Sequence, residues 1–125
     1  MINVVKDYGN EKLDNLIQEL LYPDLEKSRF KYDQLIIKTD EDELIGGLDY
    51  VINDNKTIIK NMVIKPAYQK KGYGNLLIEE ALKVLGNQEI IGEGVFNPNS
   101  IKILKKNGFN RKIKGIFNYY PNLKE

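Results

Sequence analysis

The chain has 125 residues, a 30% charged fraction and a formal net charge of +1. One domain spanning residues 1–125 fits this length, and the near-neutral charge argues against a nucleic-acid partner, which favours an excess of basic residues. The sequence contains no cysteine and no histidine, so disulfides, thiolate nucleophiles, the usual zinc sites and the commonest general base are excluded, and we expect no metal. Any catalytic acid or base must therefore be a carboxylate, a tyrosine, a lysine or water.

The first residues, Met1 to Asp7, form an apolar run that is too short and too charged for a signal peptide. No other segment approaches the length of a membrane span. We therefore expect a soluble, cytoplasmic protein without a membrane partner.

The N-terminal half is predicted to form a strand, a helix and an antiparallel meander. β-Branched residues favour a strand at 2–6, and Asn10 is placed to cap a helix with apolar residues at helical spacing, namely Leu13, Leu16, Ile17, Leu20 and Leu21. Pro23 is expected to end that helix, and residues 22–32 to form a loop or a short second helix. Polar turns separate three further predicted strands, at 35–38, 44–52 and 57–64. Gly46-Gly47 within the second of these indicates a bulge.

The C-terminal half alternates helices with strands. Apolar residues at helical spacing follow Gly74 and end at Gly86. A strand is predicted at 90–96, then a helix that Asn97 or Asn99 caps and that ends at Asn107-Gly108, and finally one or two strands within 109–120. The order β-α-β-β-β-α-β-α-β predicts one mixed α/β unit.

The most informative segment is a basic loop that joins the strand ending at Ile64 to the helix after Gly74. A helix start presents unpaired N–H groups and a partial positive charge, which together bind anions. Gly72 and Gly74 allow a ligand to approach the backbone, and Lys70-Lys71 adds positive charge. A phosphate site and an ordinary solvated turn both remain open on this pattern. P-loop and dinucleotide motifs do not fit, because Gly74 is followed by Asn75-Leu76-Leu77.

Ile64-x-Pro66 followed by Gln69, Gly72 and Gly74 resembles the coenzyme A signature of the GNAT superfamily, Arg/Gln-x-x-Gly-x-Gly/Ala. A second segment is similar to the family's Asn-x-x-Ala-Ile…Lys-x-Gly-Phe pattern, with Ser100 in place of the alanine, at Asn97, Ser100, Ile101, Lys106, Gly108 and Phe109. The likeness covers residues 34–113. It implies a GNAT-like α/β fold, in which helices flank both faces of a central, mostly antiparallel, splayed mixed sheet.

The resemblance implies an acyltransferase that moves an acetyl or similar short acyl group from acetyl-CoA to a primary amine of a small molecule or peptide by direct attack. It assigns the coenzyme's pantetheine arm to Met62, Val63 and Ile64. The pyrophosphate is assigned to the loop and helix start, at Gln69, Lys70, Lys71, Gly72, Tyr73, Gly74 and Asn75. Asn97 is expected to face the pantetheine and Lys106 to lie near the coenzyme. Family members are often dimers, so both a monomer and a homodimer remain open.

The catalytic groups are where the sequence departs from the family. Leu104 holds the position where the family often places a tyrosine that protonates the departing thiolate. Three other phenols can donate to sulfur in its place, those of Tyr73, Tyr119 and Tyr120. Glu93 and Asp49 are the candidate bases, although each can also be an ordinary solvent-facing carboxylate. We predict Glu93 and Tyr119 as the catalytic pair. Leu104 also keeps open a non-catalytic acyl-CoA-binding sensor or interaction module.

Overall fold

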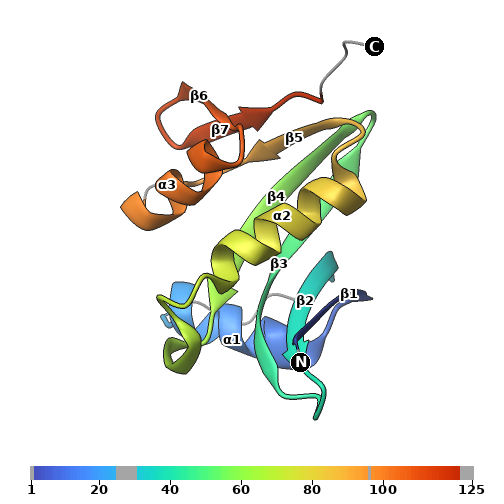
Figure 1. Cartoon of the computed structure of the whole chain (residues 1–125), viewed down its shortest axis with the longest axis vertical. Coiled ribbons are helices and arrows are strands. Elements are labelled where there is room, and N and C mark those ends of the chain that lie inside the picture. The colour runs from blue at the N-terminus through green and yellow to red at the C-terminus, as the bar shows by residue number, and fades with distance from the viewer. Residues whose placement is uncertain (1, 25–30, 96, 122–125) are drawn as a thin grey trace.

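The computed structural model describes residues 2–24, 31–95 and 97–121. Within these ranges it contains a seven-stranded sheet, three α-helices and one 3₁₀ turn (Figure 1). The elements in chain order are β1 (Ile2–Tyr8), α1 (Glu11–Leu21), β2 (Asp33–Thr39), β3 (Leu44–Asn53), β4 (Lys56–Ile64), η1 (Pro66–Tyr68), α2 (Tyr73–Leu85), β5 (Glu89–Gly92), α3 (Pro98–Lys106), β6 (Asn110–Ile113) and β7 (Ile116–Tyr119).

The sheet has the strand order β1-β2-β3-β4-β5-β7-β6. Strands β1 to β4 pair antiparallel in succession, which confirms the predicted meander. β4 pairs with β5 in parallel, and β5 continues antiparallel through β7 to β6. The predicted mostly antiparallel mixed sheet is therefore confirmed, and the C-terminal region forms two strands. Residues 25–30 of the predicted loop lie outside the described ranges.

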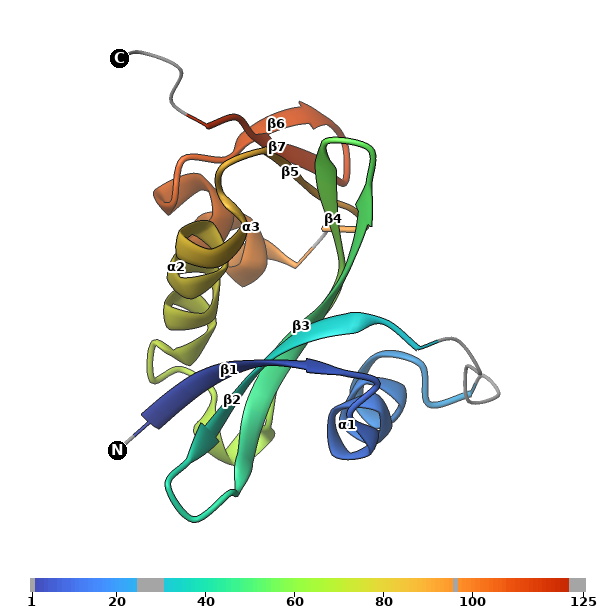
Figure 2. The same ribbon diagram turned by 90° about the vertical axis from the view of Figure 1, so that its right-hand side faces the viewer.

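Helices cover both faces of the sheet (Figure 2). On one face, α1 packs its apolar stripe against the sheet in a cluster of Leu13, Leu16, Ile17, Ile36, Leu44 and Val63. On the other face, α2 and α3 bury a larger cluster that includes Leu35, Leu48, Ile59, Leu77, Ile78, Leu104 and Phe117. Burial of these apolar side chains is the main favourable term in folding.

The helix starts follow the predicted caps with one shift. The Asn10 side chain accepts a hydrogen bond from the Leu13 N–H at 2.9 Å. The Asn97 side chain caps α3 by accepting from the Asn99 N–H at 2.8 Å. α2 begins at Tyr73 rather than after Gly74, because its cap residue Gly72 adopts the left-handed conformation with φ of 87°, which glycine reaches without steric cost.

Strands β4 and β5 part halfway along β4. Their pairing runs from Lys56 opposite Glu89 to Ile59 opposite Gly92. The N–H of Glu93 still donates to the Ile59 carbonyl at 3.4 Å, but the Val95 N–H donates to the Gly115 carbonyl instead. The strand predicted at 90–96 was therefore too long: β5 ends at Gly92, where the chain turns away from β4. Phe96, its last predicted residue, lies outside the described ranges.

A β-bulge in β4 lies at the same point. Asp49 of β3 pairs with Asn61, and the next residue, Tyr50, pairs with Ile59, so that Lys60 is the extra residue. A bulge bends its strand and increases the local twist. The bend begins where the partner strand on the other side ends. The two halves of the sheet therefore diverge from this point.

Gly46 and Gly47 allow close packing in β3. A Cβ on Gly46 would lie 2.3 Å from the Val63 carbonyl oxygen, and one on Gly47 would lie 2.6 Å from the Leu35 carbonyl oxygen. The register shift predicted here is present, since Ile37 pairs with Gly46 and Lys38 with Leu44. The extra residue is Ile45, directly before the glycine pair.

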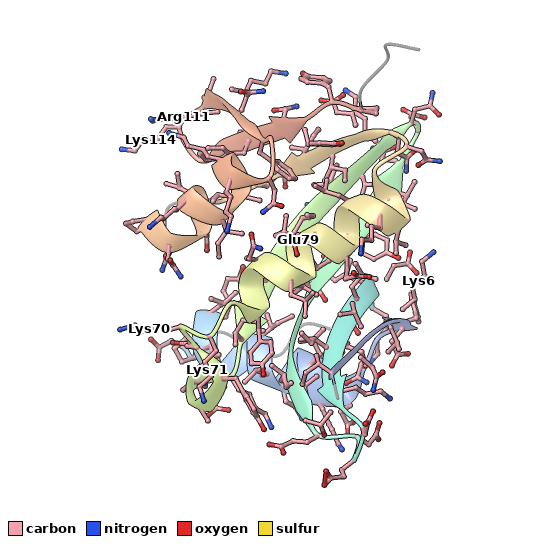
Figure 3. The ribbon with its side chains drawn as sticks, in the orientation of Figure 1. Lys6, Lys70, Lys71, Glu79, Arg111 and Lys114 are labelled. Atoms are coloured by element: carbon pink, nitrogen blue, oxygen red, sulfur yellow. The ribbon has the colours of Figure 1, made fainter. Side chains whose placement is uncertain are left out.

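The outer strands of the sheet are β1 and β6. All four residues of β6 are exposed, and Arg111 of this strand lies with Lys114 at that end of the molecule (Figure 3). In the part of the chain that the structure describes, no helix is both long and apolar enough to cross a membrane.

We expect Gly46→Ala to lower the free energy of unfolding by about 1–3 kcal/mol, because the added methyl group meets the Val63 carbonyl inside the sheet. The measurement is urea unfolding followed by circular dichroism. Asn53→Ala, at the exposed end of β3, is the control and should change stability by less than about 0.5 kcal/mol. Equal effects of the two substitutions would contradict the close packing.

Candidate active site

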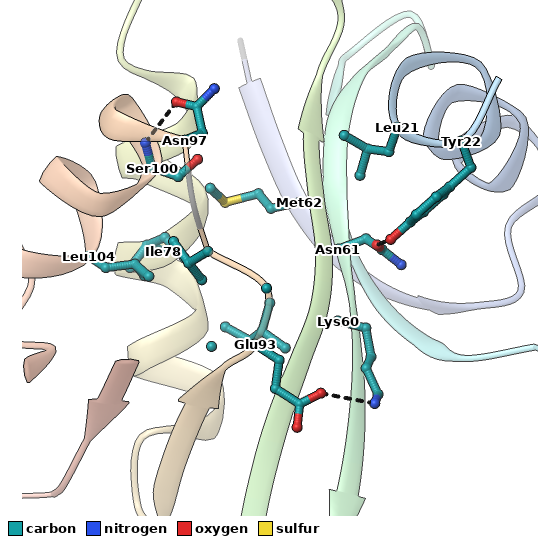
Figure 4. Close-up of a pocket in the computed structure, with 14 residues that line it drawn as sticks. Leu21, Tyr22, Lys60, Asn61, Met62, Ile78, Glu93, Asn97, Ser100 and Leu104 are labelled. Carbon is teal, nitrogen blue, oxygen red and sulfur yellow. Dashed lines mark hydrogen bonds and ion pairs between the residues drawn. The ribbon is translucent and has the colours of Figure 1, made fainter. Parts of the chain in front are cut away.

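A cavity of about 300 Å³ opens where β4 and β5 part (Figure 4). Its lining comes from four regions of the chain: the end of α1, the middle of β4, the segment after β5, and the faces of α2 and α3. The residues are Leu21, Tyr22, Ile59, Lys60, Asn61, Met62, Ile78, Gly92, Glu93, Gly94, Val95, Asn97, Ser100 and Leu104.

The cavity connects the two faces of the sheet. Leu21 and Tyr22 reach it from α1, whereas Ile78 and Leu104 reach it from α2 and α3, which cover the opposite face. The two groups of residues can line one space only because β5 no longer pairs with β4 beyond Ile59. The parted strands therefore leave a passage in the sheet that is lined by residues from both faces.

The predicted phosphate loop lies between β4 and α2. The N–H groups of Tyr73, Gly74 and Asn75 precede the first helical hydrogen bond, which the Leu76 N–H donates to the Gly72 carbonyl at 3.0 Å. Such N–H groups, with the helix dipole, favour an anion. A Cβ on Gly72 would have no neighbour within 4 Å, so the backbone there is open to a ligand.

Three side chains of this loop have different surroundings. Lys70 and Lys71 are exposed and lie directly before α2 (Figure 3). The Gln69 side chain donates from Nε2 to the Ile64 carbonyl at 3.0 Å. Gln69 therefore connects the loop to the end of β4, and the two lysines add positive charge at the surface.

The three predicted pantetheine residues on β4 point in different directions. Met62 lines the cavity. The Val63 side chain is 5% exposed and packs in the α1 cluster on the other face. The Ile64 side chain lies beside Gly46 of β3. Of the three side chains, only that of Met62 reaches the cavity.

The second motif places α3 against the cavity. Asn97, Ser100 and Leu104 all line it, while Lys106 is exposed in the last turn of α3 and is not part of the lining. The motif also contains a contact that the sequence did not predict. Asn107 donates from Nδ2 to Asn75 Oδ1 at 2.8 Å, which joins the end of α3 to the start of α2.

Glu93, one of the two predicted catalytic residues, lines the cavity just after β5. Its Oε1 lies 3.1 Å from Lys60 Nζ, and the two side chains are 40% and 36% exposed. The ion pair spans the gap between the parted strands (Figure 4). The structure thus brings a carboxylate and an ammonium group to the passage through the sheet.

The predicted tyrosines lie elsewhere. Tyr119, the other predicted catalytic residue, packs its ring on Phe109 with the ring centroids 5.5 Å apart. Tyr73 packs edge-on to Tyr68, and Tyr120 is 57% exposed. None of these three phenols is among the described residues that line the cavity. Leu104 does line it, in the place that the resemblance gives to a tyrosine.

Tyr22 is the phenol that does reach the cavity, and the sequence gave no signal for it. Its Oη donates to Asn61 Oδ1 at 2.6 Å (Figure 4). Asn61 Nδ2 donates in turn to Asp49 Oδ2 at 3.1 Å. The signal is missing because this contact depends on the β4 bulge, which sets the direction of the Asn61 side chain.

Asp49 is the buried centre of this chain of hydrogen bonds. It is 3% exposed, so it is not a solvent-facing carboxylate, and it is not among the residues that line the cavity. Its Oδ1 accepts from Gln34 Nε2 at 2.7 Å. Burial raises the pKa of Asp49, the hydrogen bonds from Gln34 and Asn61 oppose that rise, and the negative charge of Asp14 adds to it.

The described residues contain no group of three or more aspartates or glutamates arranged to hold a metal ion. The charged groups that the structure places at the passage are those of Lys60 and Glu93. The structure thus combines parted strands, a helix start with free N–H groups and a partly exposed carboxylate around one cavity.

The comparisons with known proteins identify the family. Residues 5–109 match the model of the Acetyltransferase (GNAT) family. The chain belongs to this family and is an acetyltransferase of the acetyl-CoA-dependent type. No curated protein matches the sequence significantly.

Solved structures share the fold at low sequence identity. The ribosomal-protein-S18-alanine N-acetyltransferase of Escherichia coli matches with a TM-score of 0.79 and 13% identity over 100% of this chain and 97% of that chain. A putative N-acetyl transferase of E. coli, YhhK, bound to coenzyme A, has a TM-score of 0.73 with 13% identity over 96% and 98%. Arabidopsis thaliana Naa50, in complex with the bisubstrate analogue CoA-Ac-MVNAL, has a TM-score of 0.66 with 17% identity over 92% and 95%. These likenesses support the predicted GNAT-like fold.

The raised pKa of Asp49 predicts how stability depends on pH. The folded state binds the Asp49 proton more tightly than the unfolded chain, whose ordinary value is 3.8. The stabilising contribution of this group is therefore complete below that value and is lost as pH rises through the folded pKa. We expect the free energy of unfolding of the wild type, minus that of Asp49→Asn, to fall as the pH rises above 3.8. Urea titrations at several pH values measure it, and a difference that grows with pH would contradict the assignment.

Proposed function

We propose that this acetyltransferase transfers the acetyl group to a primary amine of a small molecule or a peptide. The observation that carries the proposal is the passage through the sheet at the parting of β4 and β5. Because the passage is lined from both faces of the sheet, a donor and an acceptor would reach the same lining residues from opposite sides. A direct transfer requires that both substrates are held next to each other in one site.

The chain has groups suited to hold acetyl-CoA on the α2 and α3 face. The N–H groups of Tyr73, Gly74 and Asn75 would bind the pyrophosphate, with Lys70 and Lys71 adding positive charge. The free side of β4, including Met62, and the side chain of Asn97 would line the pantetheine. Lys106 would contribute from the exposed end of α3. When bound, the coenzyme supplies an activated acetyl thioester.

Glu93 is the proposed general base. An alkyl amine is mostly protonated at neutral pH and must lose a proton to attack a carbonyl carbon. Glu93 lies in the passage and would accept that proton, directly or through a water molecule. Lys60, 3.1 Å from it, keeps the carboxylate paired when the site is otherwise free. Leu104, in the place that the resemblance gives to a proton-donating tyrosine, has no proton to give, so the departing thiolate would take its proton from solvent.

The neighbouring structures support an amine acceptor. The E. coli neighbour is described as acting on an alanine of ribosomal protein S18, and the Naa50 complex holds an analogue that joins coenzyme A to a peptide. Another neighbour is the N-acetylglutamate synthase of Neisseria gonorrhoeae in complex with coenzyme A and L-arginine. Amines of proteins and of small molecules therefore both occur as acceptors on this fold.

A non-catalytic acyl-CoA-binding module is the second candidate. The apolar side chain of Leu104 in the cavity favours it, because the usual proton donor is missing. The two candidates differ in one measurement. A module binds acetyl-CoA and releases no thiol with any amine.

The first test is calorimetric binding of acetyl-CoA. We expect the wild type to bind and the double variant Gly72→Glu, Gly74→Glu to lose binding, because two carboxylates would repel the pyrophosphate at the helix start. The control is Asn53→Glu, Asn55→Glu, which adds the same charge to the exposed β3–β4 turn. Circular dichroism checks that each variant folds. Equal affinities of the two double variants for acetyl-CoA would contradict the assignment of the cofactor to this loop.

The second test concerns the base. We expect Glu93→Gln to lower kcat about 10²- to 10⁴-fold, because the amide cannot accept the amine proton. Acetyl-CoA binding should stay as in the wild type. Thiol release is measured with three probes: a tetrapeptide with a free N-terminus, Nα-acetyl-lysine amide and n-butylamine. Glu80→Gln, outside the cavity lining, with a side chain on α2 that is 27% exposed and paired with Lys83, is the matched control. Unchanged kcat in Glu93→Gln would exclude it as the base.

A further inference from the structure

The hydrogen bonds around Asp49 have a fixed direction. A carboxylate only accepts hydrogen bonds, and both oxygens of Asp49 have an amide nitrogen as partner, Gln34 Nε2 at 2.7 Å and Asn61 Nδ2 at 3.1 Å. Asn61 must therefore turn its NH₂ group toward Asp49. Its carbonyl oxygen is left to face the other way, toward Tyr22.

Tyr22 must then be the donor in its contact with Asn61. The two oxygen atoms lie 2.6 Å apart, and an amide oxygen has no proton to give. The single hydroxyl proton of Tyr22 is thus committed to Asn61. What the Tyr22 oxygen presents to the cavity is its lone pairs.

Gln34 lies at the other end of this chain of hydrogen bonds, and its side-chain amide cannot turn. The Gln34 oxygen accepts from the Asn10 N–H at 2.7 Å, and its NH₂ group donates to Asp14 Oδ1 at 2.8 Å as well as to Asp49. Gln34 is completely buried. Each of its partners requires the amide in its present orientation, so Gln34 fixes the direction of the hydrogen bonds at the buried end of the chain of hydrogen bonds.

The backbone of Tyr22 is also anchored. It caps the C-terminus of α1, its N–H donates to the Gln18 carbonyl at 3.1 Å, and its own carbonyl accepts from the Gln18 side chain. The phenol therefore extends from a fixed helix end to the cavity, on the α1 side of the sheet and beside Leu21 (Figure 4).

We propose that Tyr22 Oη accepts a hydrogen bond from the N–H of the acceptor amine, and that Asp49 and Asn61 are positioning residues that keep the phenol oxygen in this accepting state. The inference rests on the proposed function, since it names the group that recognises the amine. The chemical class of ligand is one with an N–H directed at the α1 side of the passage. Tyr22 is not a proton donor to the thiolate, because its proton is held by Asn61.

Kinetics with n-butylamine test the role, because this probe has no polar group besides its amine. We expect Tyr22→Phe to raise the KM for n-butylamine about 3- to 10-fold, the loss of one hydrogen bond, and to leave the KM for acetyl-CoA unchanged. Tyr8→Phe, on β1 and 62% exposed, is the matched control. An unchanged KM for the amine in Tyr22→Phe overturns the proposal.

Substitutions at the buried end test the direction. In Asp49→Asn, the new NH₂ group faces the NH₂ of Asn61; Gln34 is held by its other partners, so Asn61 must turn and Tyr22 must point its proton into the cavity. We expect the KM for n-butylamine to rise at least as much as in Tyr22→Phe, and no further rise when the two substitutions are combined. Asp49→Asn with Asn61→Asp restores an acceptor beside Tyr22 and should lower that KM again. If Asp49→Asn raises the KM for n-butylamine as much in the Tyr22→Phe background as in the wild type, the proposed chain of hydrogen bonds is overturned.

A readout without activity separates this inference from the proposed function. The side-chain amide signals of Asn61 in ¹⁵N–¹H spectra, assigned by their loss in Asn61→Ala, should shift in Asp49→Asn as the amide turns from a carboxylate to a phenol oxygen. Signals that stay at their wild-type positions overturn the inference even where every amine is acetylated. Absence of thiol release from the wild type with all three probes overturns the proposed function and the amine role of Tyr22, while shifted amide signals would still establish the chain of hydrogen bonds.

Discussion

The parallel pairing of β4 with β5 ends at Ile59 and Gly92, and the candidate site depends on that limit. A sheet paired along its whole length would satisfy the backbone of β4 on both sides and leave no space between its halves. The bulge at Lys60 bends β4 on one side of the gap. On the other side, the chain after Gly92 turns toward the β6–β7 turn, where Val95 pairs with Gly115. Both events occur at the same level of the sheet, and together they open it.

The groups at the passage belong to two electrostatic environments. Lys60 and Glu93 are partly exposed, so water screens their charges and the pair can separate at little cost. Asp49 is buried, and its charge is balanced by amide donors instead of a cation. A buried carboxylate that is held in this way is costly to rearrange. The chain thus combines an adjustable ion pair with a rigid polar support, and it does so without histidine.

Local patterns predicted most of the fold. Helix caps such as Asn10 and Asn97 act through neighbours two or three residues away, so the sequence contains all that is needed to recognise them. The end of β5 was placed too late because apolar residues continue beyond Gly92, whereas strand length is set by the partner strand. A tertiary effect of this kind has no local signal.

The candidate site divides in the same way. The loop before α2 and the segment around α3 are each continuous in sequence, and both were predicted from their resemblance to motifs of the family. Tyr22, Asn61 and Asp49 come from three separate elements and meet only because of the bulge in β4, so no spacing predicts their contact. At the outer edge of the sheet, Arg111 and Lys112 lie in β6 with all of its residues exposed. A second copy that added its own β6 there would bring like charges together across the new ladder. The β6 edge of this sheet thus resists extension into larger β-structures.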